Sequence, residues 1–129
     1  MTTQIEAALA PRPMGAYSQG VRVGNTIQVS GQMGIDPATS SLAGETTYAQ
    51  TVQALRNVRA ILQEVDADFD DVLMLRVYLQ SPEGFAELNR AFEDVLSAPF
   101  PARTTLFGVL PPGLLVEIDA LAIASGVGE

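Results

Sequence analysis

The sequence predicts an α+β domain in which two helices pack on one face of a mixed β-sheet, in the element order β-β-α-β-α-β-β. Both amphipathic helical segments are flanked by segments with strand alternation. The length of 129 residues suits one domain with a substantial core. An apolar content of 47 % beside 17 % charged residues is ordinary for a globular protein. We therefore assign 1–129 to a single domain and expect loose termini at about 1–10 and 124–129.

The chain begins its regular structure with a hairpin. Residues 21–32, VRVGNTIQVSGQ, alternate apolar and polar side chains on either side of Gly24-Asn25. Gly and Asn tolerate the positive φ angles of a tight hairpin turn. Residues 33–44 are rich in Gly, Pro and Ser, which predicts a loop after the hairpin.

A long amphipathic helix is expected over 46–65. Thr47 and Gln50 have the spacing of a capping box at its start. Apolar residues that recur every three or four positions define the face that it buries. These are Tyr48, Val52, Leu55, Val58, Leu62 and Val65.

A strand and a second helix follow. Residues 71–79, DVLMLRVYL, alternate in the manner of a strand. One face of this strand is expected to contain Leu73, Leu75, Val77 and Leu79. Residues 81–96 predict the second helix, because apolar side chains again recur at helical spacing. Its buried stripe is expected to contain Phe85, Leu88, Phe92, Val95 and Leu96.

Two final strands are expected over 103–110 and 114–123, joined by a Pro-Pro-Gly turn. One face of the last strand contains Val116, Ile118, Ala120 and Ala122. The other contains Leu115, Glu117, Asp119, Leu121 and Ile123. This second face is too apolar to remain in water, and the sequence offers no third helix to cover it. We therefore expect a homo-oligomer in which another copy covers this face.

The absent residue types restrict the chemistry. The chain has no His, Cys, Lys or Trp, and all seven of its basic side chains are Arg. This excludes imidazole catalysis, thiol nucleophiles, a lysine Schiff base and His/Cys metal sites. The acidic cluster DADFDD at 66–71 lacks the glycine and terminal glutamate of a calcium loop, so we expect a solvated turn and no metal.

Charge and hydropathy narrow the possible partners. A net charge of −8 without a basic stripe disfavours nucleic-acid binding. No apolar run approaches the roughly 18 residues of a membrane span. The start at 1–13 lacks the cationic region of a secretory signal. We therefore expect a cytoplasmic protein without membrane contact.

Two ions stand in segments that otherwise predict burial. The planar donor fork of Arg103 suits a carboxylate, although a surface position or a structural ion pair also explains it. Arg76 is a rival anion binder for which a salt bridge or interface packing is an equal explanation. Glu117 lies between apolar strand residues, where partial burial raises a carboxyl pKa toward general-base use. The alternative for Glu117 is an ion pair across a subunit interface, and Asp119 on the same strand face could exchange roles with it.

Three polar residues are further candidates for a pocket wall. Tyr17 lies in the glycine-bounded segment GAYSQG, where the alternative is an aromatic plug on a turn. Ser30 ends a strand in VSGQ, which is also common turn chemistry. Asn89 lies at the edge of the second helix's apolar stripe, where its amide needs a partner and could bond the backbone or reach a pocket.

Several motifs recur together along the chain. They are GAYSQGVRVGNTIQVSGQ with DPAT after it, YAQTVQALRNVRAIL, VYL, F-x-x-x-N-x-x-F, PARTT, LPPG and LVEIDA. In this combination the sequence resembles the RidA/YjgF family of reactive-intermediate deaminases. The resemblance runs from about Ala10 to Ala122.

The resemblance implies a chorismate-mutase-like α+β fold and a homotrimer with pockets between subunits. It also implies an activity of the 2-iminobutanoate/2-iminopropanoate deaminase type. Such a hydrolase converts enamines and imines, for example 2-aminoacrylate and its tautomer 2-iminopropionate, to a 2-keto acid and ammonia. The ligand is then a small imino or keto acid, and no cofactor is used.

By position, the resemblance implies that Arg103 holds the substrate carboxylate and that Glu117 positions the attacking water. The residues expected to bind the substrate around them are Tyr17, Ser30, Asn89 and Thr105. Thr105 occupies a position where the family often has cysteine, and its backbone is expected to contact the substrate nitrogen.

The chemistry suits a chain without strong nucleophiles. Imines are already electrophilic, so a carboxylate clamp and one water-orienting carboxylate are enough. The alternative is a non-catalytic module of the same family that binds a 2-keto acid or another small carboxylate. A ribonuclease is less favoured, because the chain is acidic and has no histidine.

Overall fold

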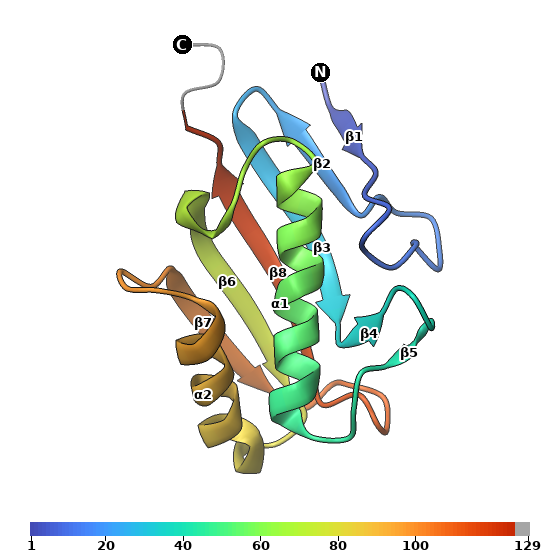
Figure 1. Ribbon diagram of the computed structural model, residues 1–129, viewed down its shortest axis with the longest axis vertical. Coiled ribbons are helices and arrows are strands. Elements are labelled where there is room, and N and C mark those ends of the chain that lie inside the picture. Colours follow the sequence, from blue (N-terminus) through green and yellow to red (C-terminus); the bar gives the residue numbers. More distant parts are fainter. Residues whose placement is uncertain (126–129) are drawn as a thin grey trace.

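A computed structural model describes residues 1–125 and shows one mixed sheet with two helices in front of it (Figure 1). The helices are α1 (Thr47–Gln63) and α2 (Phe85–Val95). The sheet contains β1 (Thr3–Ile5), β2 (Gly20–Val23), β3 (Thr26–Met33), β6 (Val72–Leu79), β7 (Ala102–Phe107) and β8 (Val116–Ile123). Their spatial order is β1-β2-β3-β8-β6-β7, and only β6 and β7 run parallel. The predicted strands and helices all occur in the predicted order, with three further strands before α1.

The structure adds strands that the sequence pattern did not indicate. A small hairpin of β4 (Ile35–Asp36) and β5 (Ser41–Leu42) occupies the predicted loop. The expectation of a loose N-terminus is wrong, because β1 pairs with β2 and Ile5 is 2 % exposed. At the other end Ala124 is buried and donates its N–H to the Asn25 carbonyl at 2.8 Å. The rest of the predicted loose C-terminus, 126–129, lies outside the described residues.

The core lies between the helices and the sheet. Val116, Ile118, Ala120 and Ala122 are all fully buried there, as the alternation of the last strand predicted. On β6, Leu75, Val77 and Leu79 join them, but Leu73 is 52 % exposed. The register between β6 and β8 shifts between Val72 and Met74, so the extra residue turns Leu73 out of the predicted face.

The buried face of α1 is rotated from the predicted one. Tyr48 and Val52 are only partly buried, whereas Ala54 and Ile61 are fully buried. The predicted capping box at Thr47 is also wrong, because Thr46 is the N-cap and its side chain accepts the Ala49 N–H at 3.1 Å.

The amide of Gln50 does not cap the helix but joins two loops. Its Nε2 donates to the carbonyls of Gly44 and Gly113, and its Oε1 accepts the N–H of Leu115. Leu88 and Phe92 on α2 and Leu96 directly after it are buried as predicted. Val95 is only partly buried, and Phe85 is 41 % exposed in the first turn.

The sheet face opposite the helices is open and carries exposed apolar side chains beside its charged residues. Leu106 and Ile123, 53 % and 46 % exposed, lie on it. That a second copy of the chain covers this sheet face stays a prediction. In the described part of the chain, no helix combines the length and the apolar composition that crossing a membrane requires.

Candidate functional site

The predicted site residues fall into two groups on opposite faces of the sheet. Arg103 pairs in register with Leu75, whose side chain is in the core, so Arg103 lies on the helix side. Glu117 alternates with the core residues Val116 and Ile118, so it lies on the open side. The two side chains therefore cannot meet within one chain.

The first group surrounds Arg103 at the edge of the sheet. Its Nη1 donates to Asn89 Oδ1 at 2.8 Å. The guanidinium carbon lies 5.0 Å from the ring centroid of Phe92 and 5.4 Å from that of Phe85, both on α2. These contacts are within the range of cation–π attraction and help to hold the guanidinium in place. A cavity of about 290 Å³ opens beside it, lined by Asn89, Phe92, Glu93, Phe100, Pro101 and Arg103.

The charge of Arg103 is not neutralised by the described residues. The ion pairs among these residues are Arg59–Asp68 and Arg76–Asp119, and neither includes Arg103. Burial lowers the pKa of the Arg103 guanidinium, although an arginine remains charged at neutral pH. A half-buried cation whose amide partner takes only one of its five donors is suited to a bidentate carboxylate.

The second group surrounds Glu117, between β3 and β6. In register, Glu117 lies beside Met33 on one side and Tyr78 on the other. The β3–β8 pairing shifts between Val29 and Gln32, so two residues of β3 oppose one residue of β8. Gly31 lies in this bulge, and the Glu117 carboxylate occupies the space where a side chain at Gly31 would be.

Glu117 and Asp119 have different surroundings, which separates their roles. Burial raises the pKa of Glu117, and the negative charge of Asp119 raises it further. Asp119 accepts from Arg76 Nε at 2.9 Å, whereas no described cation is paired with Glu117. Arg76 is thus explained by a salt bridge, and Glu117 is left without a cationic partner among the described residues.

Tyr17 and Ser30 line the cavity that contains Glu117. Ser30 Oγ donates to the Ser18 carbonyl at 2.6 Å, which attaches the loop before β2 to β3. Tyr17 is 49 % exposed, and its hydroxyl accepts the Met14 N–H at 3.1 Å. This open cavity has a volume of about 550 Å³ and also contains Gln28, Gly31, Met33, Arg76 and Asp119 on its walls.

Thr105 is near the first group but lines neither cavity. It lies two residues after Arg103, on the same side of β7, and is half-buried opposite Val77.

Sequence reasoning did not assign a site role to Gly31 or Phe100. The Ser-Gly pair that ends the predicted strand and the PFPAR motif were the available signals. Among the described residues, no group of three or more acidic side chains gathers in a way that could hold a metal.

Comparisons with a family model, with individual proteins and with solved structures all lead to one protein family. The model of the family described as "Endoribonuclease L-PSP" matches residues 7–124. A RutC family protein of Saccharolobus solfataricus is 39 % identical over 114 residues, which cover 88 % of this chain and 90 % of that protein. The human 2-iminobutanoate/2-iminopropanoate deaminase is 37 % identical over 120 residues, covering 92 % and 88 %.

Solved structures agree with the fold. The crystal structure of RidA from Psychrobacter sp. PAMC 21119 has a TM-score of 0.89 and 39 % identity, over 95 % of this chain and 99 % of that one. The predicted α+β fold is therefore confirmed. The chain belongs to the endoribonuclease L-PSP family, which is the RidA/YjgF family that its motifs resemble.

Proposed function

We propose that this protein is a hydrolytic deaminase of enamine and imine intermediates, with 2-iminopropionate as the simplest substrate. Water is added to the C=N bond, and the products are a 2-keto acid and ammonia. The observation that carries the proposal is the half-buried Arg103, which is held by Asn89 and two aromatic rings and has no acidic partner among the described residues. The deaminase names of relatives such as the human protein support it.

Arg103 would bind the carboxylate of the imino acid. With one Nη1 hydrogen bonded to Asn89, the remaining donors of the guanidinium are available to two carboxylate oxygens. The rings of Phe85 and Phe92 restrict the side chain before the ligand arrives, which lowers the entropy lost on binding.

Glu117 would orient the attacking water. The water oxygen forms a bond to the imine carbon while its proton passes through the carboxylate to the nitrogen. In the resulting carbinolamine the hydroxyl proton passes through the same carboxylate to the nitrogen while the C–N bond breaks, so ammonia leaves and the carbonyl forms. A pKa raised by burial makes Glu117 a better proton acceptor than an exposed glutamate.

This mechanism requires two copies of the chain. Arg103 and Glu117 lie on opposite sheet faces, so the Arg103 of one subunit would face the Glu117 of a neighbour. The open sheet face, with its exposed apolar residues Leu106 and Ile123, is available for such an assembly. We propose the homotrimer that the family resemblance implies, with Tyr17, Ser30 and Thr105 completing the pocket and with the cytosol as its location.

The proposal is tested with a serine or threonine dehydratase that supplies the intermediate, by following loss of the imine. Arg103→Ala should abolish the acceleration, whereas Arg56→Ala, an exposed arginine on α1, should leave it unchanged. Glu117→Gln should lower turnover by about 100-fold or more and retain 2-keto acid binding. Full activity in Arg103→Ala would exclude the clamp.

Two other results would favour the alternatives. Binding of 2-keto acids without any imine turnover by the unaltered protein would indicate a binding module. RNA cleavage that disappears in Glu117→Gln, with no imine turnover, would indicate a ribonuclease.

A further inference from the structure

The matched pairs on either side of the β3–β8 bulge define its extent. Val29 pairs with Ala120 before it, and Gln32 pairs with Ile118 after it. Residues 30 and 31 of β3 therefore lie opposite a single residue of β8. Because a bulge interrupts the ladder of backbone hydrogen bonds, its shape depends on contacts from outside the ladder.

The side chain of Gln28 joins the two strands at the edge of this bulge. Its Nε2 donates to the carbonyls of Val29 and Ala120, at 3.0 Å in each case. These two residues are the last matched pair, so one amide fastens β3 to β8 at the point where the ladder is interrupted. Among the described residues, no other side chain is hydrogen-bonded to both of these strands.

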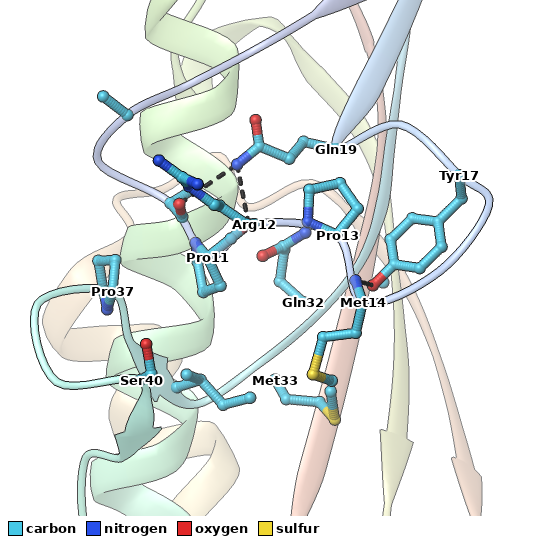
Figure 2. A pocket seen from close by; sticks show the side chains of 14 residues that line it. Pro11, Arg12, Pro13, Met14, Tyr17, Gln19, Gln32, Met33, Pro37 and Ser40 are labelled. Atoms are coloured by element: carbon cyan, nitrogen blue, oxygen red, sulfur yellow. Dashed lines mark hydrogen bonds between the residues drawn. The ribbon is translucent and has the colours of Figure 1, made fainter.

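The bulge is also attached to the loop before β2. Ser30 donates its N–H to the Gln19 carbonyl at 2.9 Å. Gln19 is itself held, since its side chain donates to the carbonyls of Ala10 and Pro11 (Figure 2). The bulge therefore stays bonded to this loop without Gln28, whereas its side-chain fastening to β8 depends on Gln28.

The position of the Glu117 carboxylate depends on the bulge. This carboxylate occupies the space beside Gly31, where an added Cβ would lie 2.9 Å from Glu117 Cδ. A movement of β3 relative to β8 therefore moves this space. Gln28 is half-buried on the wall of the cavity that contains Glu117, and the hydrogen bonds of its side chain go to backbone carbonyls. Its effect on Glu117 therefore passes through the two strands.

We propose that Gln28 is a positioning residue for imine hydrolysis: it fastens β3 to β8 beside the bulge and so fixes Gly31 and the Glu117 carboxylate relative to each other. This inference rests on the proposed function, because the position of Glu117 matters for turnover only if Glu117 orients the attacking water. Gln28 then affects the chemical step more than ligand binding, which Arg103 provides from the opposite sheet face.

Gln28→Met tests this role, because it keeps the length of the side chain and removes both donors. We expect kcat for imine hydrolysis to fall by about tenfold, which corresponds to a shift of about half an ångström. The Kd for pyruvate should stay within about twofold. Gln80→Met is the matched control, since it removes amide hydrogen bonds to the Leu110 and Pro111 carbonyls outside the Glu117 cavity and should leave kcat unchanged. Unaltered kcat in Gln28→Met, or equal losses in kcat and in binding, would overturn the inference.

A double variant with Gly31→Ala tests the route. If Gln28 acts through Gly31 and Glu117, its loss costs little in a chain whose Glu117 is already displaced. We therefore expect kcat of the double variant to lie within about threefold of that of Gly31→Ala alone. If the losses of the two single variants multiply instead, Gln28 acts elsewhere and the inference fails.

A spectroscopic readout separates this inference from the proposed function. In protein isotope-labelled at the carboxyl carbons of glutamate, the Glu117 NMR signal is the one that disappears in Glu117→Gln. Gln28→Met should shift this signal in the ligand-free protein, whereas Gln80→Met should not. An unmoved Glu117 signal in a protein that hydrolyses imines would refute the positioning role alone. A shifted signal together with no imine turnover by the unaltered protein would refute the proposed function, while the link from Gln28 to Glu117 would stand.

Discussion

The contact between Gly31 and Glu117 gives the most specific prediction about catalysis. A Cβ at Gly31 would lie 2.9 Å from Glu117 Cδ and closer still to the carboxylate oxygen, so Gly31→Ala must displace the carboxylate. Gly31 is not among the glycines with positive φ, so its backbone accepts alanine without strain. The damage is therefore confined to the position of Glu117.

The size of the effect follows from this displacement. Moving a catalytic group by about 1 Å can cost on the order of 100-fold in rate, so we expect kcat for imine hydrolysis to fall by about that factor. Binding of a 2-keto acid should change much less, because Arg103 lies on the other sheet face. Gly15→Ala is the matched control, since its Cβ would meet nothing closer than 3.6 Å. Gly31→Ala with unaltered kcat would refute the role of Glu117.

Three other changes test the electrostatics and the packing. Asp119→Asn removes the negative charge that helps to raise the Glu117 pKa, so the acid limb of the kcat–pH profile should move to lower pH; a shift to higher pH would contradict this cause. Thr51→Val should raise the free energy of unfolding by about 1 kcal/mol in denaturant titration, because the fully buried Thr51 hydroxyl has no hydrogen-bond partner among the described residues. A loss of stability would mean that the hydroxyl is bonded. Ile5→Ala should lower the free energy of unfolding by about 2 kcal/mol, because Ile5 is buried. An unchanged free energy of unfolding would support the loose N-terminus that the sequence predicted.

The fold was predictable for strands in which buried and exposed residues alternate strictly and which have a neighbouring strand on each side. The last strand shows this, because β8 lies inside the sheet and its inward residues are all small or branched and buried. Leu73 was misplaced because a bulge changes the alternation without any mark in the sequence. β1 was missed because three residues at a chain end give no period, although their pairing with β2 buries Ile5.

The two ions of the site were identifiable from the sequence, but their arrangement was not. Glu117 alternates with buried residues, so its sheet face could be read directly. Arg103 lies on the edge strand β7, where exposed and half-buried residues alternate weakly. Its face became known only from the register with Leu75 and the hydrogen bond to Asn89. The loop before β2 is held by the buried amide of Gln19, which bonds the backbone of Ala7, Ala10 and Pro11 and which no local pattern indicates.

Mixing two inactive variants tests the central claim, that each site takes Arg103 from one subunit and Glu117 from another. Arg103→Ala and Glu117→Gln chains would be co-expressed with different tags, and the hybrid assemblies purified through both tags. In a homotrimer-like ring that contains both chains, one site in three has both native residues, so we predict about a third of the wild-type activity. Activity that stays at the level of the separate variants would contradict a site shared between subunits.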